Sequence, residues 1–133
     1  MIEKINHIAV AVRSLEKHIP FYRDVLGLEY RGTEVVEEQK VRLAVFRVGE
    51  VNIELLEPTG PDSPISSFLE KWGEGMHHIS YQVDDIEGQI AELKAGGVRM
   101  IDETPRAGAH GSRIAFLHPA SSARVLTELT QAV

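Results

Sequence analysis

The chain contains two similar segments, and this internal repeat restricts the possible fold more than any other feature of the sequence. HIAVAVRSLEKHI, which begins at His7, matches HISYQVDDIEGQI, which begins at His78, 71 positions later. Histidine, isoleucine and valine stand at matching places, and apolar residues then follow at intervals of four and three in both copies. This spacing predicts a strand followed by an amphipathic helix in each half. The chain is therefore expected to consist of two similar modules.

Each predicted helix is followed by three strand-like runs, which are rich in valine, isoleucine, phenylalanine and leucine and alternate with polar residues. They cover residues 28–36, 40–48 and 51–58 in the first half and residues 98–105, 112–119 and 124–131 in the second. Between the halves, SPISSFLEKWGEG predicts a short helix that begins at Pro64 and ends at Gly73. Each module is thus predicted to be a strand, a helix and three strands.

The helix boundaries also follow from the sequence. The second module's helix is predicted to begin at Asp84 as N-cap, with Glu87 three residues later as in a capping box, and to stop at Gly96. The first module's helix is predicted to run from Ser14 towards Gly27, with Pro20 bending it or loosening its turns because proline cannot donate the backbone hydrogen bond.

The length of 133 residues suits one ordinary domain. We expect a single domain over 1–133, with module 1 at about 1–60, the linker helix at about 61–74 and module 2 at about 75–133. No apolar run is long enough for a membrane span, and the N-terminus lacks the layout of a signal peptide. These features predict a cytoplasmic protein. The net charge of −6 argues against a nucleic-acid partner.

The chain has no cysteine, so any bound metal must take nitrogen and oxygen ligands. Four such side chains stand at matching places in the repeat: His7 and His78 on the first strands, and Glu54 and Glu128 on the last strands. Both glutamates lie among apolar strand residues, where an ionised carboxylate is costly unless a cation or strong donors compensate it. A divalent metal is the simplest compensation. The four residues are therefore predicted metal ligands.

The adjacent histidines, His77 and His78, cannot both serve this site, since successive strand side chains point to opposite faces. His78 is the one in repeat register with His7. His77 is therefore expected to have a structural role or to support a metal ligand from outside the site. His110 and His118 lie in loops near strand ends, where a substrate contact is an open alternative to a solvated surface position.

Several longer segments point to a known family. The duplicated module with a histidine on each first strand and a glutamate on each last strand resembles the vicinal oxygen chelate superfamily. The segments IELLEPTGPDSPISSFLEKWGEGMHHISYQVDDIE, GVRMIDETPRAGAHGSRIAFLHPASS and VLTELT are similar to those of methylmalonyl-CoA epimerases within it. The resemblance covers nearly the whole chain. It implies a glyoxalase-like α+β fold, in which two tandem βαβββ modules form a curved, mostly antiparallel sheet around a metal cavity.

The resemblance also implies an activity, the interconversion of the C2 epimers of methylmalonyl-CoA through a metal-stabilised enolate. It assigns the metal-ligand role to His7, Glu54, His78 and Glu128, and Glu128 is also the expected acid/base residue. The expected cofactor is a divalent ion, with cobalt before manganese, nickel, zinc or iron. A CoA thioester is the expected partner, and the fold commonly forms homodimers.

The chain differs from some or many family members at three places. Some members carry glutamine where this chain has Glu54, and some carry a carboxylate, proposed as a catalytic base, where this chain has Leu43. Members also often have lysine where this chain has Ala120. Because Leu43 is not acidic, the resemblance does not assign a second acid/base group in this chain. Three arginines in the second half are open candidates for the CoA phosphates: Arg106, Arg113 and Arg124.

Two alternative functions remain compatible with the sequence. A glyoxalase I-type lactoylglutathione lyase resembles the same metal set. A non-catalytic small-molecule-binding protein of the same fold is the alternative from a different class, and whether the four side chains bind metal distinguishes it from an enzyme.

Overall fold

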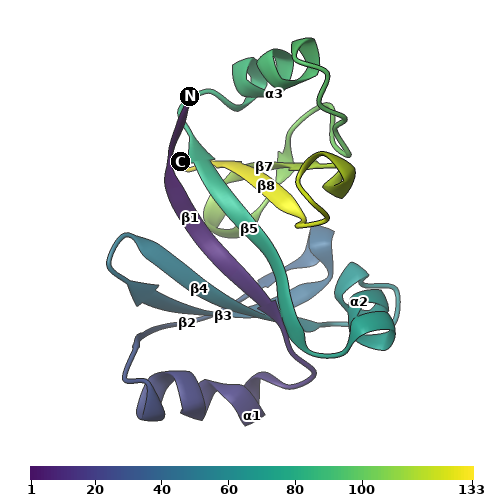
Figure 1. Ribbon diagram of the computed structural model, residues 1–133. Helices are drawn as coiled ribbons and strands as arrows, with labels where there is room; N and C mark the ends of the chain where they lie inside the picture. Colours follow the sequence, from purple (N-terminus) through teal and green to yellow (C-terminus); the bar gives the residue numbers. More distant parts are fainter. The chain divides into compact units, whose positions relative to one another are not determined.

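The computed structural model describes residues Met1–Val133 and contains two compact units. The α1 unit consists of residues 7–77, and the α3 unit consists of residues 1–6 and 78–133. The chain passes from one unit to the other within two strands, β1 (Ile2–Ala11) and β5 (Gly75–Val83), both visible as continuous arrows in Figure 1.

The α1 unit contains a strand order of β2-β3-β4-β1. Its further strands are β2 (Glu29–Val36), β3 (Val41–Val48) and β4 (Val51–Pro58). The β2/β3 and β3/β4 pairs are antiparallel, whereas β1 and β4 are parallel. The helix α2 (Pro64–Trp72) follows β4, with Pro64 at its start and Gly73 at its end. These elements confirm the strands and the linker helix predicted for this half.

The α3 unit repeats this arrangement with the order β5-β8-β7-β6. Its elements are the helix α3 (Ile86–Ala95) and the strands β6 (Arg106–Ala107), β7 (Arg113–Leu117) and β8 (Thr127–Gln131). The β6/β7 and β7/β8 pairs are antiparallel, and β5 is parallel to β8. In both units the first and last strands of the repeat are therefore parallel neighbours. The α+β class with mostly antiparallel pairing is confirmed.

The strand predicted over residues 98–105 is wrong. The segment forms only an isolated bridge between Met100 and Leu117, and the strand that pairs with β7 is the two-residue β6. The backbone N–H groups of Ile101 and Asp102 both donate to Phe116 O, and the Asp102 carboxylate accepts the Phe116 N–H at 2.9 Å. The Asp102 carboxylate therefore takes the Phe116 N–H that a backbone carbonyl of a neighbouring strand would otherwise accept. Pro105 has no N–H with which to form a further hydrogen bond between strands.

Pro20 interrupts the first helix as predicted. The α-helix α1 (Leu15–Pro20) is followed by a π-helical turn over Phe21–Val25, in which Leu26 N donates to Phe21 O at 2.9 Å. Since proline lacks the N–H that an α-helix needs at its position, the chain continues with a wider turn. Short 3-10 turns occur at Glu37–Gln39, Ala109–Gly111 and Pro119–Ser121.

The N-cap of α3 is Asp85, not Asp84 as predicted. The Asp85 carboxylate accepts the Gly88 N–H at 3.2 Å. Asp84 instead accepts from the N-terminal ammonium of Met1 at 2.7 Å. Either aspartate could cap the helix chemically. Asp84 is paired with the ammonium of Met1, and Asp85 accepts the helix N–H. The predicted stop at Gly96 is confirmed.

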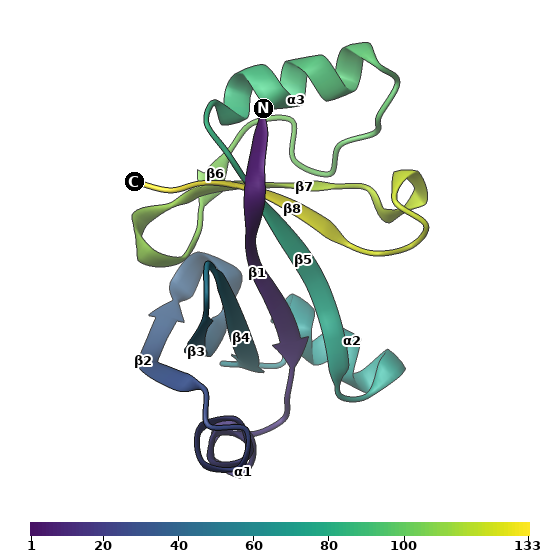
Figure 2. The same cartoon turned by 60° about the vertical axis from the view of Figure 1, so that its left-hand side comes forward.

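A helix covers one face of the strands in each unit, and the apolar core lies between them (Figure 2). The buried core residues of the α1 unit are Val12, Leu15, Ala44, Phe46 and Leu55. Those of the α3 unit are Val83, Ile86, Ile90, Ala115, Leu117 and Leu129. Alternation along each strand directs the intervening residues to the other face. That second face carries the buried histidines and glutamates.

Candidate metal centre

In the α1 unit, the parallel pairing of β1 and β4 places a histidine and a glutamate on one face. Ala9 is the register partner of Glu54, and His7 lies two residues before Ala9, so its side chain points to the same face. His7 Nδ1 lies 3.6 Å from Glu54 Oε2. Both residues are buried.

The α3 unit contains the equivalent pair. Ser80 is the register partner of Glu128 in the parallel β5/β8 pair, and His78 lies two residues before Ser80. His78 Nε2 lies 3.7 Å from Glu128 Oε2, and both residues are buried. Each half of the repeat therefore places one imidazole beside one carboxylate, at nearly the same separation.

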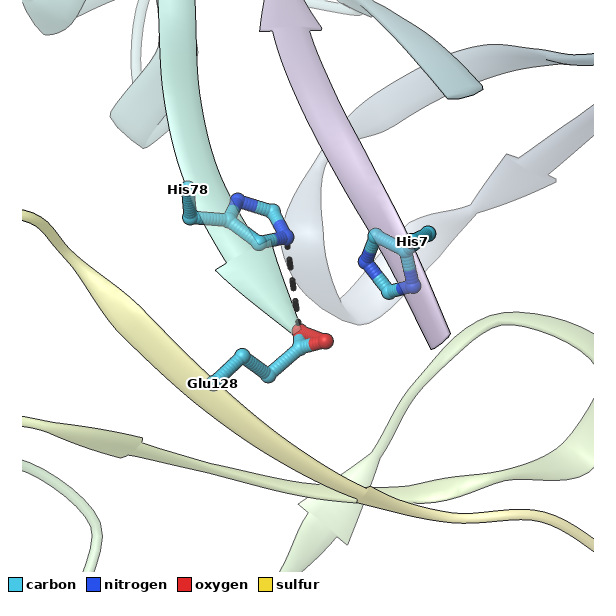
Figure 3. Close-up of side chains that lie close together, drawn as sticks. All are labelled: His7, His78 and Glu128. Atoms are coloured by element: carbon cyan, nitrogen blue, oxygen red, sulfur yellow. Dashed lines mark ion pairs between the residues drawn. The ribbon is translucent and has the colours of Figure 1, made fainter. Parts of the chain in front are cut away.

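Three of the four predicted ligands lie close together. One ligand atom from each of His7, His78 and Glu128 lies within 4.8 Å of the others, and Figure 3 shows the three side chains pointing towards one another from β1, β5 and β8. Glu54 is not one of this group of three, and its carboxylate lies beside His7. Two buried imidazoles and a carboxylate are a donor set that borderline divalent metals prefer.

The residues fit a divalent ion on two grounds. Ligand atoms about 2.0–2.2 Å from an ion are separated by about 3.0–3.5 Å at neighbouring positions, which is close to the spacing of each His–Glu pair. The fully buried Ser80 Oγ, beside Glu128 in the strand register, has no hydrogen-bond partner. A buried polar atom without a partner is costly, so this face is better satisfied when it binds a polar ligand.

His77 points away from the His78 face, as the alternation predicts. Its ring packs edge-on against Phe68 of α2, with centroids 4.9 Å apart and planes at 80°. This contact agrees with the structural role predicted for His77. His78 instead packs edge-on against Phe116, at 5.3 Å and 88°.

The arginines that were open candidates for phosphate binding have different surroundings. Arg113 makes two hydrogen bonds to the Glu87 carboxylate of α3, at 3.0 and 2.7 Å, and so faces the helix. Arg106 lies over the Phe116 ring, with Cζ 5.4 Å from the centroid. Sequence reasoning did not identify this contact, because the predicted strand covered residues 98–105, whereas the two-residue β6 pairs Arg106 with Ile114 near Phe116.

Two loop features complete the description of this half. His118 Nδ1 accepts the Ala120 N–H at 3.0 Å, which fixes its remaining proton on Nε2 when the ring is neutral. Ala123 and Arg124 both have positive φ, at 54° and 67°, in the loop that leads to β8. A substrate contact by His110 or His118 stays a prediction.

Leu43 is buried on β3, where its register partner on β2 is Glu34.

The fold and this site define a class of protein. The sequence pattern of the Glyoxalase/Bleomycin resistance protein/Dioxygenase superfamily matches residues 6–116, and the chain belongs to this superfamily. Within it, the chain is similar to methylmalonyl-CoA epimerases, as the sequence segments predicted.

Two relatives show the extent of this similarity. The mitochondrial methylmalonyl-CoA epimerase of Mus musculus is 42% identical over 130 residues, which cover 97% of this chain and 73% of the relative. The ethylmalonyl-CoA/methylmalonyl-CoA epimerase of Cereibacter sphaeroides is 40% identical over 133 residues, which cover 98% of this chain and 99% of the relative.

Solved structures agree with this assignment. A methylmalonyl-CoA epimerase in complex with methylmalonyl-CoA and NH4+ is 40% identical, with a TM-score of 0.95 over 100% of this chain and 96% of that chain. A variant of the Streptomyces coelicolor epimerase in complex with 2-nitronate-propionyl-CoA is 41% identical, also with a TM-score of 0.95. The predicted glyoxalase-like fold is confirmed. No helix of the present structure is both long and apolar enough to cross a lipid bilayer.

Proposed function

We propose that this protein is a metal-dependent epimerase that interconverts the C2 epimers of methylmalonyl-CoA. The observation that carries the proposal is the pair of buried His–Glu contacts in matching positions of the repeat. The similarity to epimerases over nearly the full chain supports the substrate. A lactoylglutathione lyase uses related chemistry, but the two relatives and two structures described above are epimerases acting on or bound to CoA thioesters.

The proposed metal ligands are His7, His78 and Glu128, with Glu54 as the fourth. The two histidines bind as neutral imidazoles through one ring nitrogen each. A divalent ion held there supplies Lewis-acid stabilisation of the negative charge that develops next to the thioester carbonyl. We place cobalt first among the candidate ions, followed by manganese, nickel, zinc and iron.

Glu128 is the proposed acid/base residue. Epimerisation requires that the C2 proton leave one face of the carbon and that a proton return to the other face. A carboxylate at the edge of the ligand group can accept the proton, and its buried position strengthens the electrostatic interactions that accompany the transfer. Glu54 and an ordered water are the two candidate proton donors for the opposite face, since Leu43 cannot take that role in this chain.

Hydrogen exchange at C2 tests this proposal. Metal-replete protein is incubated with methylmalonyl-CoA in deuterated water, and deuterium at C2 is measured by mass spectrometry. We expect exchange in the wild type and a loss of at least about 100-fold in Glu128→Gln, which is typical of removing a general base. Glu50→Gln, in the exposed turn between β3 and β4, is the matched control and should exchange normally.

Three results would contradict the proposal. Normal exchange in Glu128→Gln removes this residue from the mechanism. Turnover of a glutathione hemithioacetal without turnover of methylmalonyl-CoA assigns the protein to the lyase class. Binding of the thioester with neither reaction, in protein that elemental analysis shows to contain metal, indicates a non-catalytic binding protein.

A further inference from the structure

Arg106 lies on the same face of the α3 unit as the His78–Glu128 pair. Three pairs of register partners establish this placement. Ser80 of β5 pairs with Glu128 of β8, Glu128 pairs with Phe116 of β7, and Ile114 of β7 pairs with Arg106 of β6. Register partners share a face, and so do residues two apart on one strand. Arg113, one residue from Ile114, therefore lies on the opposite face, where it binds Glu87.

Two contacts hold the Arg106 side chain in place. Its guanidinium lies over the Phe116 ring at 5.4 Å, and the same ring packs against the His78 imidazole at 5.3 Å. Arg106 Nε also pairs with Asp102 Oδ1 at 3.2 Å, while Asp102 Oδ2 accepts the Phe116 N–H. Asp102 is largely buried, so the same carboxylate fixes both the aromatic ring and the cation above it.

This arrangement leaves a binding edge on the guanidinium. The ion pair with Asp102 uses Nε, and the two terminal nitrogens of an arginine carry four further N–H donors in a fork that matches a carboxylate. The side chain is 44% exposed, so a ligand can reach it. A cation with prepositioned donors beside a buried ligand pair is suited to bind an anionic part of the substrate.

We infer that Arg106 binds the free carboxylate of the malonyl group. This inference rests on the proposed function. In a malonyl thioester the carboxylate is bonded directly to C2, whereas the CoA phosphates lie at the far end of the pantetheine arm. One aromatic ring separates Arg106 from the ligand histidine, which favours the group nearest the reacting carbon. Arg106 also offsets the repulsion between that carboxylate and Glu128.

Binding measurements test the inference independently of turnover. Cobalt-loaded protein is titrated by calorimetry with methylmalonyl-CoA and with propionyl-CoA, which lacks only the carboxylate. In Arg106→Gln we expect the Kd of methylmalonyl-CoA to rise about 10- to 100-fold, as for a lost charge-assisted hydrogen bond, and that of propionyl-CoA to change less than about threefold. Arg106→Lys should restore part of the affinity for methylmalonyl-CoA alone.

Arg113→Gln is the matched control, because it removes the same charge from the other face and should alter neither Kd. Equal weakening of both thioesters in Arg106→Gln would overturn the inference in favour of a contact with the CoA portion. Unchanged affinity for both would overturn it in favour of a purely structural arginine. Thermal melting verifies that each variant is folded.

These outcomes are separable from the proposed function. If Arg106→Gln weakens binding of methylmalonyl-CoA alone but the wild type shows no C2 exchange, the inference is supported and the epimerase function is refuted. If the wild type exchanges the C2 hydrogen but Arg106→Gln has no selective effect on methylmalonyl-CoA binding, the epimerase function is supported and the inference is refuted.

Discussion

A carboxylate at position 54, where some family members carry glutamine, gives this site a second acidic group beside His7. Leu43 stands where some members carry a carboxylate, so the chain lacks an acid at this buried position of β3. The two differences compensate if Glu54 donates the proton to the second face of C2. If Glu54 takes the role that the carboxylate at position 43 has in other members, substituting Glu54 alone should have a specific effect.

Glu54→Gln should separate hydrogen exchange from inversion. The amide remains a possible metal ligand, and Glu128 still removes the proton, so C2 exchange should fall less than about tenfold. Formation of the opposite epimer should fall at least about 100-fold, because the second face loses its donor. Chiral analysis of the product in deuterated water measures both rates in one experiment. Equal loss of both, with the metal content unchanged, would contradict the assignment.

The two His–Glu pairs were predictable from sequence because repeat register and strand alternation together determine which histidine lies beside which glutamate. His78 could be chosen over His77 on this basis alone. Arg106 could not be assigned, since the strand predicted over residues 98–105 ended before it. Asp102 accepts the Phe116 N–H in that segment, and only the short β6 that follows pairs Arg106 with Ile114. Sequence periodicity predicts regular strands, but it does not predict where a side chain such as Asp102 accepts a backbone N–H and so interrupts the strand.

At the scale of the element, α3 offers a test of capping. Asp85→Ala should lower the free energy of unfolding by about 1 kcal/mol, because the Gly88 N–H loses its acceptor. Asp84→Ala removes only an exposed ion pair with the N-terminal ammonium and should leave the free energy of unfolding nearly unchanged. Urea unfolding of the two variants measures the difference. A larger loss in Asp84→Ala would show that the N-cap had been misassigned.

Glu74 connects the start of α1 to the segment before β5. Its carboxylate accepts the Arg13 N–H at 2.8 Å and lies 2.9 Å from His18 Nε2. The hydrogen bond from the Arg13 backbone, followed by the His18 contact, lowers the pKa of Glu74 below its usual value of 4.5. The stabilisation is therefore fully present above the ordinary pKa and is lost as the pH falls through the lower folded pKa.

Glu74→Gln should accordingly lower the Tm by a few degrees at about pH 7, and the difference from wild type should shrink below about pH 4. Thermal melts across this pH range provide the measurement. A constant difference at all pH values would show that packing, not the ionised carboxylate, explains the loss. His18→Gln is a partial control, since it leaves the Arg13 contact in place.

At the scale of the whole molecule, removal of the metal should destabilise the protein without unfolding it. Each unit has its own apolar core, so the fold does not depend on the ion. A ligand that binds only the native state contributes about 4 kcal/mol at a thousandfold excess over its Kd. The Tm should rise with added cobalt in the wild type and not in His78→Ala. A chelated protein without a cooperative transition would contradict this expectation.

The single-domain organisation over residues 1–133, the homodimer and the cytoplasmic location stay predictions. Light scattering distinguishes a dimer from the 14.8 kDa monomer.

The first six residues have a consequence for any attempt to divide the chain at the repeat. Asn6 donates to Gln82 at 3.1 Å, and Gln82 in turn donates to Glu3, so the N-terminal part of β1 belongs with the second half of the sequence. A fragment that begins at the linker helix would lack this strand, although it carries a complete copy of the duplicated pattern. In a fragment-complementation experiment, the fragment that begins at the linker helix is therefore expected to fold only when the N-terminal fragment, which carries β1, is added.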